Sequence, residues 1–179
     1  MDIKKLQFPI GKYIPNKNPN HELIAQWIKQ IEDFPTEVEN ACRDISIEQL
    51  NWRHRPGGWT VKQLVHHCSD SHMNSLIRFK LALTEKSPTI KPYFEDKWAE
   101  LADSLDNNIE HSLNLLRGLH KKWALLLRSL NDQQLELEYT HPEHGEIFNL
   151  AETIGNYAWH CKHHLTHINN AIASNGKYN

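Results

Sequence analysis

Four histidines lie within eight residues near the C-terminus of this 179-residue chain: His160, His163, His164 and His167. Imidazole is the commonest metal-binding side chain and changes its charge close to neutral pH. Two histidines four residues apart on a helix project from the same face and can both reach one ion. The stretch contains two such pairs. Residue types alone therefore predict a metal-binding helix but do not choose between the pairs.

An apolar stripe along the same segment indicates which pair faces a protein core. At about 100° per residue, one face carries Leu150, Ile154, Ala158, Cys161, Leu165, Ile168 and Ile172. His164 lies roughly 65° and His160 roughly 105° from the middle of that face. His167 lies roughly 125° and His163 roughly 165° away, toward the back of the helix. We predict that His160 and His164 are the metal-binding pair; the alternative is a solvated polar face that is rich in histidine.

A second group of histidines, His66, His67 and His72, falls on another segment with helical periodicity. His72 lies in the middle of the apolar stripe, which is typical of a buried, hydrogen-bonded histidine. His66 and His67 flank the stripe on opposite sides, and helical phase does not choose between them. One of these histidines with His160 and His164 would make a three-histidine site. Three protein ligands leave a fourth position for water or substrate, as in catalytic zinc sites, and the nitrogen ligands also suit nickel.

No carboxylate stands where His-Glu-x-x-His metallopeptidases carry their general base, because that position is Cys161. Water activation would therefore fall to the metal, which lowers the pKa of bound water toward ~7, or to a residue from elsewhere in the chain. Asp70 is a candidate, but its helical phase indicates a solvated surface charge. We also expect His141, in a loop beside a proline, to be exposed to solvent.

Helical spacing of apolar residues predicts four long helices, over about residues 21–44, 60–84, 109–130 and from 150 onward. Pro35 is expected to kink or split the first helix. Thr60 with Gln63, and Asn149 with Glu152, have the spacing of N-terminal helix caps.

The remaining segments are predicted to be connections. Residues 1–20 contain three prolines and a glycine and are predicted to form an extended arm. Residues 86–108 have the length of the crossover that some helix bundles use. Residues 138–148 are predicted to form a small hairpin or ordered loop that turns at 142–145. Four long helices without a convincing sheet predict one all-α domain, a four-helix bundle over residues 1–179.

The composition argues against several other classes of protein. A formal net charge of -2 gives no bulk attraction to nucleic acid or anionic membranes. The longest apolar run, 123–127, is far too short for a membrane span, and the N-terminus lacks the apolar core of a signal peptide. The scattered Cys42, Cys68 and Cys161 fit no disulfide framework, so we predict buried thiols in a cytoplasmic protein.

Several motifs resemble the DinB/YfiT superfamily. They are GGWTVKQLVHH at 57–67, DSHMNS at 70–75, RFK at 78–80 and WHxxxH at 159–164. The resemblance covers nearly the whole chain and is closest to the YfiT branch, whose members are described as metal-dependent hydrolases. It implies a four-helix bundle, a homodimer, and zinc or nickel as the metal.

The resemblance also implies a ligand set. In that family the first ligand is the histidine eight positions after the tryptophan, which is His67 here, and the other two are His160 and His164. The resemblance thus selects His67 over His66. One departure is Cys68, where relatives usually carry leucine. A cysteine beside a ligand suggests thiolate ligation, but the core-facing phase of Cys68 argues against it.

Three functions are compatible with such a site. The first, which we predict, is a hydrolase in which one divalent metal per subunit activates water against a small-molecule substrate. The second is a thiol S-transferase, because the superfamily includes enzymes that join low-molecular-weight thiols such as bacillithiol to electrophiles. A metal-held thiolate would need no water-activating base. The third is a non-catalytic metal-binding module, which the open fourth coordination position argues against. No protein side chain is identified as catalytic, and neither nucleic acid nor membrane is expected as a partner.

Overall fold

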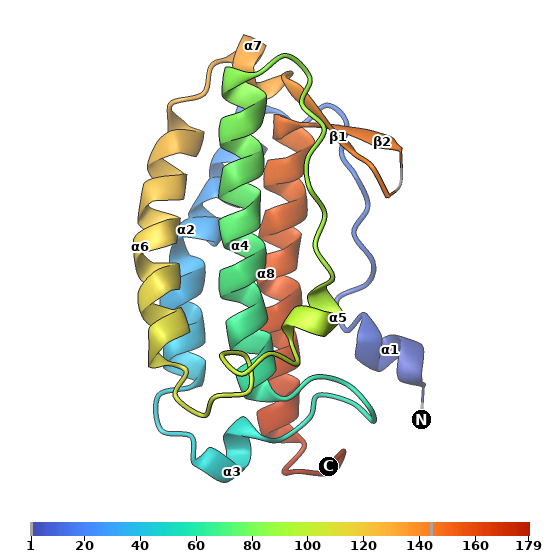
Figure 1. Ribbon diagram of the computed structural model, residues 1–179, viewed down its shortest axis with the longest axis vertical. Coiled ribbons are helices and arrows are strands. Elements are labelled where there is room, and N and C mark those ends of the chain that lie inside the picture. Colours follow the sequence, from blue (N-terminus) through green and yellow to red (C-terminus); the bar gives the residue numbers. More distant parts are fainter. Residues whose placement is uncertain (1, 144) are drawn as a thin grey trace.

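Four long helices form the body of the molecule: α2 (His21–Ala41), α4 (Val61–Thr84), α6 (Glu110–Arg128) and α8 (Leu150–Ala173) (Figure 1). The computed structural model describes residues 2–143 and 145–179. Both α2 and α4 pack against α6 and α8. The helices therefore form a ring in which α2 and α4, successive in the sequence, lie at opposite corners. The predicted all-α four-helix bundle is confirmed.

The connection between α4 and α6, residues 85–109, returns along the length of the bundle (Figure 1). As a result α6 begins beside the start of α4 and runs in the same direction. The connection contains the short helix α5 (Glu95–Trp98) and is held to α4 by Gln63, whose Nε2 donates to Ala99 O at 2.9 Å. This segment is the long crossover that the sequence predicted.

A two-stranded hairpin precedes α8. Strands β1 (Glu138–His141) and β2 (Glu146–Asn149) pair antiparallel, which confirms the predicted hairpin. The crossover is bound to it through a parallel bridge between Thr89 and Thr140. Residue 144, part of the predicted turn, lies outside the described residues. The hairpin and the crossover therefore lie together against one side of α4 and α8.

Side-chain caps fix where the two helices that carry the histidine groups begin. Thr60 and Gln63 form a reciprocal capping box at the start of α4, and Asn149 Oδ1 accepts from Glu152 N at 2.7 Å at the start of α8. Both caps were predicted. Because each residue rotates a helix by about 100°, a fixed start also fixes the direction of every later side chain.

Helix α2 continues through Pro35, so the prediction that this residue splits the helix is wrong. A proline has no N–H to donate to the carbonyl four residues earlier, which leaves Ile31 O without its helical donor. His120 Nδ1 of α6 donates to Ile31 O instead. A contact between helices thus satisfies the carbonyl that the proline frees.

The N-terminal arm was predicted to be extended, but it contains a short helix, α1 (Ile3–Gln7). The arm lies along α8. Tyr13 Oη donates to Glu152 O at 3.0 Å, and Trp159 Nε1 donates to Gly11 O at 3.2 Å. It therefore covers part of the α8 surface that points away from the bundle core.

The core is a continuous apolar cluster between the four helices. Its largest fully buried side chains include Trp123, Phe34, Phe79, Ile31, Leu64 and Leu116. Cys42, Cys68 and Cys161 are free thiols and buried, as predicted. The short helices α3 (Ile47–Leu50) and α7 (Asp132–Leu135) lie in the connections at the two ends of the bundle. Within the described part of the chain, no helix combines the length and apolarity that a membrane span requires.

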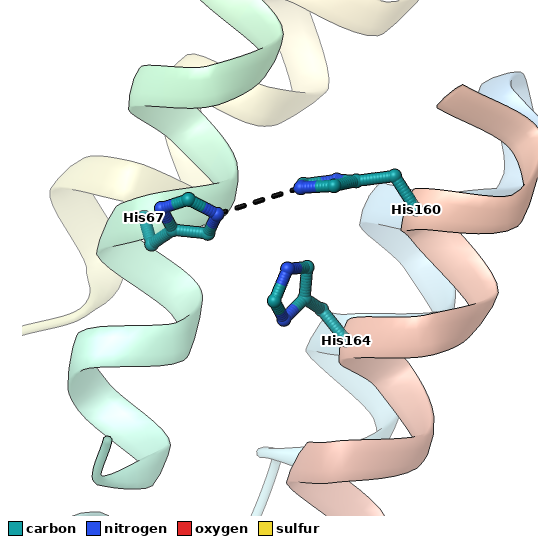
Figure 2. Close-up of side chains that lie close together, drawn as sticks. All are labelled: His67, His160 and His164. Atoms are coloured by element: carbon teal, nitrogen blue, oxygen red, sulfur yellow. Dashed lines mark hydrogen bonds between the residues drawn. The ribbon is translucent and has the colours of Figure 1, made fainter. Parts of the chain in front are cut away.

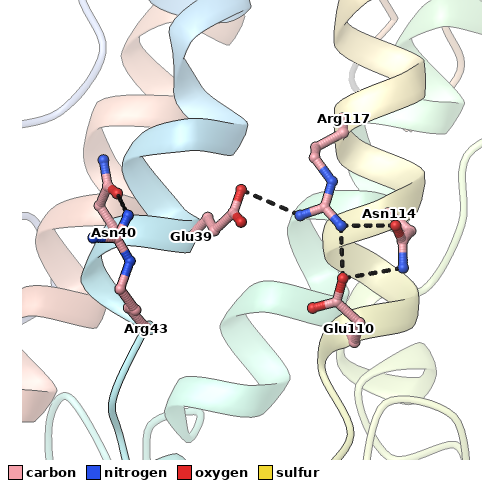
Figure 3. A network of polar contacts seen from close by, with 6 residues as sticks. All are labelled: Glu39, Asn40, Arg43, Glu110, Asn114 and Arg117. Atoms are coloured by element: carbon pink, nitrogen blue, oxygen red, sulfur yellow. Dashed lines mark hydrogen bonds and ion pairs between the residues drawn. The ribbon is translucent and has the colours of Figure 1, made fainter.

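A network of polar side chains joins α2 to α6 on the surface (Figure 3). Arg117 of α6 forms ion pairs with Glu39 of α2 at 3.2 Å and with Glu110 at 2.6 Å. These side chains are between 35% and 54% exposed, so solvent screens both pairs and their contribution to stability is small. Burial of the apolar core, rather than this network, holds the helices together.

Candidate metal centre

Three imidazole rings from two helices converge on one point (Figure 2). His67 extends from α4, and His160 and His164 extend from α8. One ring nitrogen of each lies within 4.8 Å of the other two. His67 and His164 are buried and His160 is half-buried. The packing of α4 against α8 thus brings together the three residues that were predicted as ligands.

The spacing of these rings fits a shared metal ion. His67 Nε2 and His160 Nε2 lie 3.4 Å apart. Two nitrogen ligands at about 2.0–2.1 Å from a tetrahedral ion are themselves about 3.3–3.4 Å apart. The same separation is long for a direct hydrogen bond, whose usual range ends near ~3.2 Å. The separation of this pair therefore fits two nitrogen ligands of one ion better than a histidine–histidine hydrogen bond.

A chain of hydrogen-bonded imidazoles determines which nitrogen His160 presents. Ile31 O can only accept, so His120 Nδ1 carries the proton of that bond. His120 Nε2 then accepts from His72 Nδ1 at 2.8 Å, and His72 Nε2 accepts from His160 Nδ1 at 3.0 Å. A neutral imidazole has one donor and one acceptor nitrogen, so His160 Nε2 keeps its lone pair. This nitrogen is the one that faces His67, and metal-binding histidines commonly donate their other N–H in this way.

Burial keeps these rings neutral, so that their lone pairs are free to bind a metal. Loss of hydration lowers the pKa of His67 to about 4 and holds the pKa values of His160 and His164 well below 6.5. The same cause lowers the pKa of His72 strongly and that of His120 to about 4. At neutral pH a metal would not have to displace protons from this group.

The three rings open onto a cavity of about 390 Å³, a size that suits a small molecule. Its lining combines aromatic, charged and hydroxyl side chains from the loop before α4, α4 itself, the crossover, the hairpin and α8: Trp59, His67, Ser71, Arg78, Tyr93, Glu95, His141, Glu143, Tyr157, Trp159, His160, His163 and His164. Trp59 stands directly against the histidines, with its ring centre 4.6 Å from that of His67. The candidate ligands therefore belong to a pocket that a substrate could enter.

Residues 30–168 match the DinB superfamily. The chain belongs to the DinB superfamily. A protein of Bacillus cereus strain 03BB102 is 53% identical over 93% of this chain and 95% of its own length, and a protein of Bacillus thuringiensis subsp. konkukian is equally similar. Both carry the name "Putative metal-dependent hydrolase".

A solved structure gives the same result. YfiT from Bacillus subtilis is 44% identical, with a TM-score of 0.93 over 96% of this chain and 98% of the YfiT chain. It is described as a probable metal-dependent hydrolase with an unusual four-helix bundle topology. The predicted resemblance and fold are therefore confirmed, and a metal is implied for this DinB-superfamily chain by the names of its relatives and by its histidine groups.

The structure separates the neighbours His66 and His67. His66 points away from the pocket, with Nδ1 2.8 Å from Ser112 Oγ and Nε2 3.1 Å from Asp106 O. Asp70 lies in a separate hollow beside His66 and not in the histidine cavity. Asp70 is half-buried and not the solvated surface charge that was predicted, but it lies away from the candidate ligands.

Cys68 is fully buried in the core. It belongs to neither group of converging histidines and does not line their cavity, and burial raises the pKa of its thiol. Thiolate ligation, which the sequence left open for this departure from the family pattern, is not supported.

Helical phase was misleading for His163 and His167 in this DinB-superfamily chain. Both were expected on the solvated back of the helix, yet they are only 7% and 4% exposed. The reason is the N-terminal arm, which covers that face: His167 Nε2 donates to Gln7 O at 3.1 Å, and the Phe8 ring lies 5.9 Å from that of His163. His141 is also not a fully exposed loop residue, because it is half-buried and lines the cavity.

Several cavity residues were not found from the sequence. Arg78, Tyr93, Glu95 and Glu143 come from a helix, the crossover and the hairpin, and no spacing rule connects them. His120 was also missed, although its position on the inner face of α6 was a signal that it is buried.

Between about pH 6.5 and about pH 4 the metal-free protein is expected to lose stability. His120 has a pKa of about 4 when folded and about 6.5 when unfolded, so the unfolded chain binds its proton first as the pH falls. The contribution of this ring to the free energy of unfolding is complete above pH 6.5. It is lost as the pH approaches 4, which lowers the free energy of unfolding by roughly 3 kcal/mol. Urea unfolding in the presence of a chelator, at several pH values in this window, measures the loss.

Two variants act as controls for that measurement. His120→Leu should flatten part of the pH dependence, whereas His111→Gln, at an exposed position of the same helix, should leave it unchanged. A free energy of unfolding that stays constant across the window would contradict the burial argument.

Proposed function

We propose that this protein is a metal-dependent hydrolase acting on a small-molecule substrate, with His67, His160 and His164 holding one divalent ion. The observation that supports this most is the convergence of three ring nitrogens within 4.8 Å inside a cavity of about 390 Å³. When bound, such an ion lowers the pKa of water toward ~7 and polarises a carbonyl or phosphoryl oxygen. Zinc or nickel as the ion, and a homodimer as the assembly, remain predictions.

Protein groups around the histidines orient them and limit access by water. Trp59 packs its ring against His67 and approaches His164, with ring centres 6.4 Å apart. The His120–His72 pair holds His160 in the tautomer whose Nε2 faces the pocket. The chain thus supplies a rigid group of neutral nitrogen ligands with one covered side and one open side.

Two carboxylates at the cavity provide acceptors for a proton. Glu95, on the crossover, and Glu143, after β1, both line the pocket and are exposed. Neither lies at the helical position where His-Glu-x-x-His enzymes carry their base, which Cys161 occupies. We assign the proton acceptor of the reaction to a carboxylate oxygen of this pair, supplied from outside the ligand-bearing helices.

Arg78 indicates that the substrate carries a negative charge. It lines the same cavity, and within the described residues its Nε is buried without a hydrogen-bond partner. No Asp or Glu in that part of the chain forms an ion pair with it. Leaving one buried N–H of a guanidinium group unsatisfied is costly, and carboxylates and phosphates match the planar fork of donors on this group.

Replacing Arg78 with glutamine is expected to raise the KM for anionic substrates about 10–100-fold, because a charged hydrogen bond contributes about 1.5–3 kcal/mol. Turnover of a neutral analogue should change much less. The measurement compares kcat/KM for a carboxylate-bearing ester with kcat/KM for a neutral ester, in the unmodified protein and in the Arg78→Gln variant. Lys80→Gln, which removes an exposed cation from the same helix, is the matched control.

The function is tested by incubating Zn²⁺- or Ni²⁺-loaded protein with a panel of esters, amides and phosphoesters. We expect hydrolysis of at least one class, loss of that activity with chelator, and recovery with added metal. Absence of turnover across the panel would contradict the proposal.

A thiol S-transferase is the second candidate. It is favoured by Cys161, which stands where a water-activating glutamate would otherwise be and is itself buried with a raised pKa. The same metal-loaded protein is incubated with a bimane-type electrophile and several low-molecular-weight thiols. Metal-dependent conjugate formation without hydrolysis of the panel would select this function, and absence of conjugates would remove it.

A further inference from the structure

Helix α8 carries a second group of converging histidines beside the first. One ring nitrogen from each of His163, His164 and His167 lies within 4.8 Å of the other two. The three residues are only 7%, 7% and 4% exposed. His164 belongs to both groups, whereas His163 and His167 lie on the side of α8 that the N-terminal arm covers.

The three rings share an unmet requirement. The Nδ1 atom of each is buried and, within the described residues, has no hydrogen-bond partner. A buried polar atom without a partner costs about 1–3 kcal/mol. Three such atoms on adjacent rings indicate one partner that satisfies them together.

The surroundings of His167 resemble those of a metal ligand. Its Nε2 donates a proton to Gln7 O at 3.1 Å, so in the neutral ring the lone pair is on the unpartnered Nδ1. A backbone carbonyl that accepts the other N–H is the arrangement that metal-binding histidines commonly have. The bond also makes the ring orientation depend on the N-terminal arm.

The orientation of His163 is fixed as well. Its ring stacks on Trp159, with ring centres 4.4 Å apart and planes 17° from parallel. Trp159 in turn donates to Gly11 O of the arm. The arm therefore holds two of the three rings in place, either directly or through the tryptophan.

We propose that His163, His164 and His167 form a second position for a divalent transition metal on α8. Three imidazole nitrogens suit ions such as Zn²⁺, Ni²⁺ and Cu²⁺ and do not suit Mg²⁺ or Ca²⁺. A neutral imidazole has one lone pair, so His164 serves one ion at a time. The two groups are thus alternative positions for an ion, and the second does not depend on any hydrolytic activity.

The test is the binding of Zn²⁺ alone, by equilibrium dialysis, to variants in which the first group is disabled. The double variant His67→Gln with His160→Gln should still bind one Zn²⁺ per chain. Adding His167→Gln to this double variant should reduce the bound Zn²⁺ to the level of a control without protein. Adding His111→Gln, an exposed histidine on α6, should have no effect.

A second comparison does not need the double variant. The single substitution His164→Gln removes the residue common to both groups, so it should weaken Zn²⁺ binding more than the two substitutions His67→Gln and His160→Gln together. Circular dichroism establishes that each variant is folded.

Two results would overturn the second position: no Zn²⁺ binding by the folded double variant, or weaker binding by that variant than by His164→Gln. The variant His163→Gln with His167→Gln reports on the first group separately. If the protein with His163→Gln and His167→Gln binds no Zn²⁺ while the protein with His67→Gln and His160→Gln does, the first group is not a metal site and the second group is.

Discussion

Replacing His67 with alanine is expected to weaken divalent metal binding about 100–1000-fold at the first group and to abolish metal-dependent turnover. Zinc sites with four protein ligands bind with about 10–16 kcal/mol, which averages roughly 3–4 kcal/mol for each ligand. His67 is also the only member of this group that α4 supplies. Without it, His160 and His164 remain as a pair on one helix.

The matched control is His66→Ala. His66 precedes His67 on α4, is equally buried, and makes two hydrogen bonds of its own, to Ser112 Oγ and Asp106 O. Both substitutions should lower the free energy of unfolding, but only the one at His67 should change metal affinity. Zn²⁺ competition with a chromophoric chelator separates the two when both variants also carry His163→Gln and His167→Gln, so that only the first histidine group can bind the ion. Equal metal affinities for the two variants would remove His67 from the site.

Replacing His72 with phenylalanine is expected to weaken metal binding about 10–100-fold, although His72 is not placed as a ligand. Its ring connects His120 to His160 through bonds of 2.8 and 3.0 Å. Phenylalanine keeps the packing against Phe34 and Trp123 but leaves His160 Nδ1 without an acceptor. His160 is then free to rotate or to change tautomer, and its Nε2 lone pair is no longer held toward His67.

A graded series distinguishes this positioning role from general destabilisation. His120→Phe keeps the bond between His72 and His160 but removes both the His72–His120 bond and the anchor at Ile31 O, so its effect on metal affinity should be smaller. His66→Phe, on the same helix as His72, removes the two hydrogen bonds of His66 to Ser112 and Asp106. It should lower stability without changing metal affinity. The nitrogen chemical shifts of His160 give a direct measurement of its tautomer. If His72→Phe leaves both the affinity and the tautomer unchanged, the histidine chain has no positioning role.

Local features of the sequence were sufficient for the helices and for two of the three members of the first histidine group. Apolar spacing located α2, α4, α6 and α8, and the caps at Thr60 and Asn149 located two helix starts. The choice of His160 and His164 followed from helical phase, because these two histidines lie nearer to the apolar stripe of their helix than His163 and His167 do.

The third member of that group depends on how two helices meet. Phase left His66 and His67 equivalent, and only the family resemblance chose between them. The packing of α4 against α8 places His67 toward His160 and turns His66 toward α6. Helical periodicity specifies a direction relative to the helix's own axis, and it carries no information about which neighbour lies in that direction.

The same limit explains the residues for which prediction from sequence failed. His163 and His167 are on the back of α8, and that face is buried only because the arm folds over it. Pro35 was expected to kink or split a helix, but α2 continues through it and His120 satisfies the carbonyl that the proline frees. Each outcome depends on a contact between segments far apart in the chain.

The amino-acid sequence by itself determined the amphipathic helices, their starts and the paired histidines on the last helix, because backbone geometry repeats every 3.6 residues. Tertiary structure alone decided the cavity around Arg78, the carboxylates Glu95 and Glu143 beside it, and the hydrogen-bonded chain behind His160. Those features arise where helices, crossover, hairpin and arm come together, and burial there sets both the charge state and the orientation of each ring.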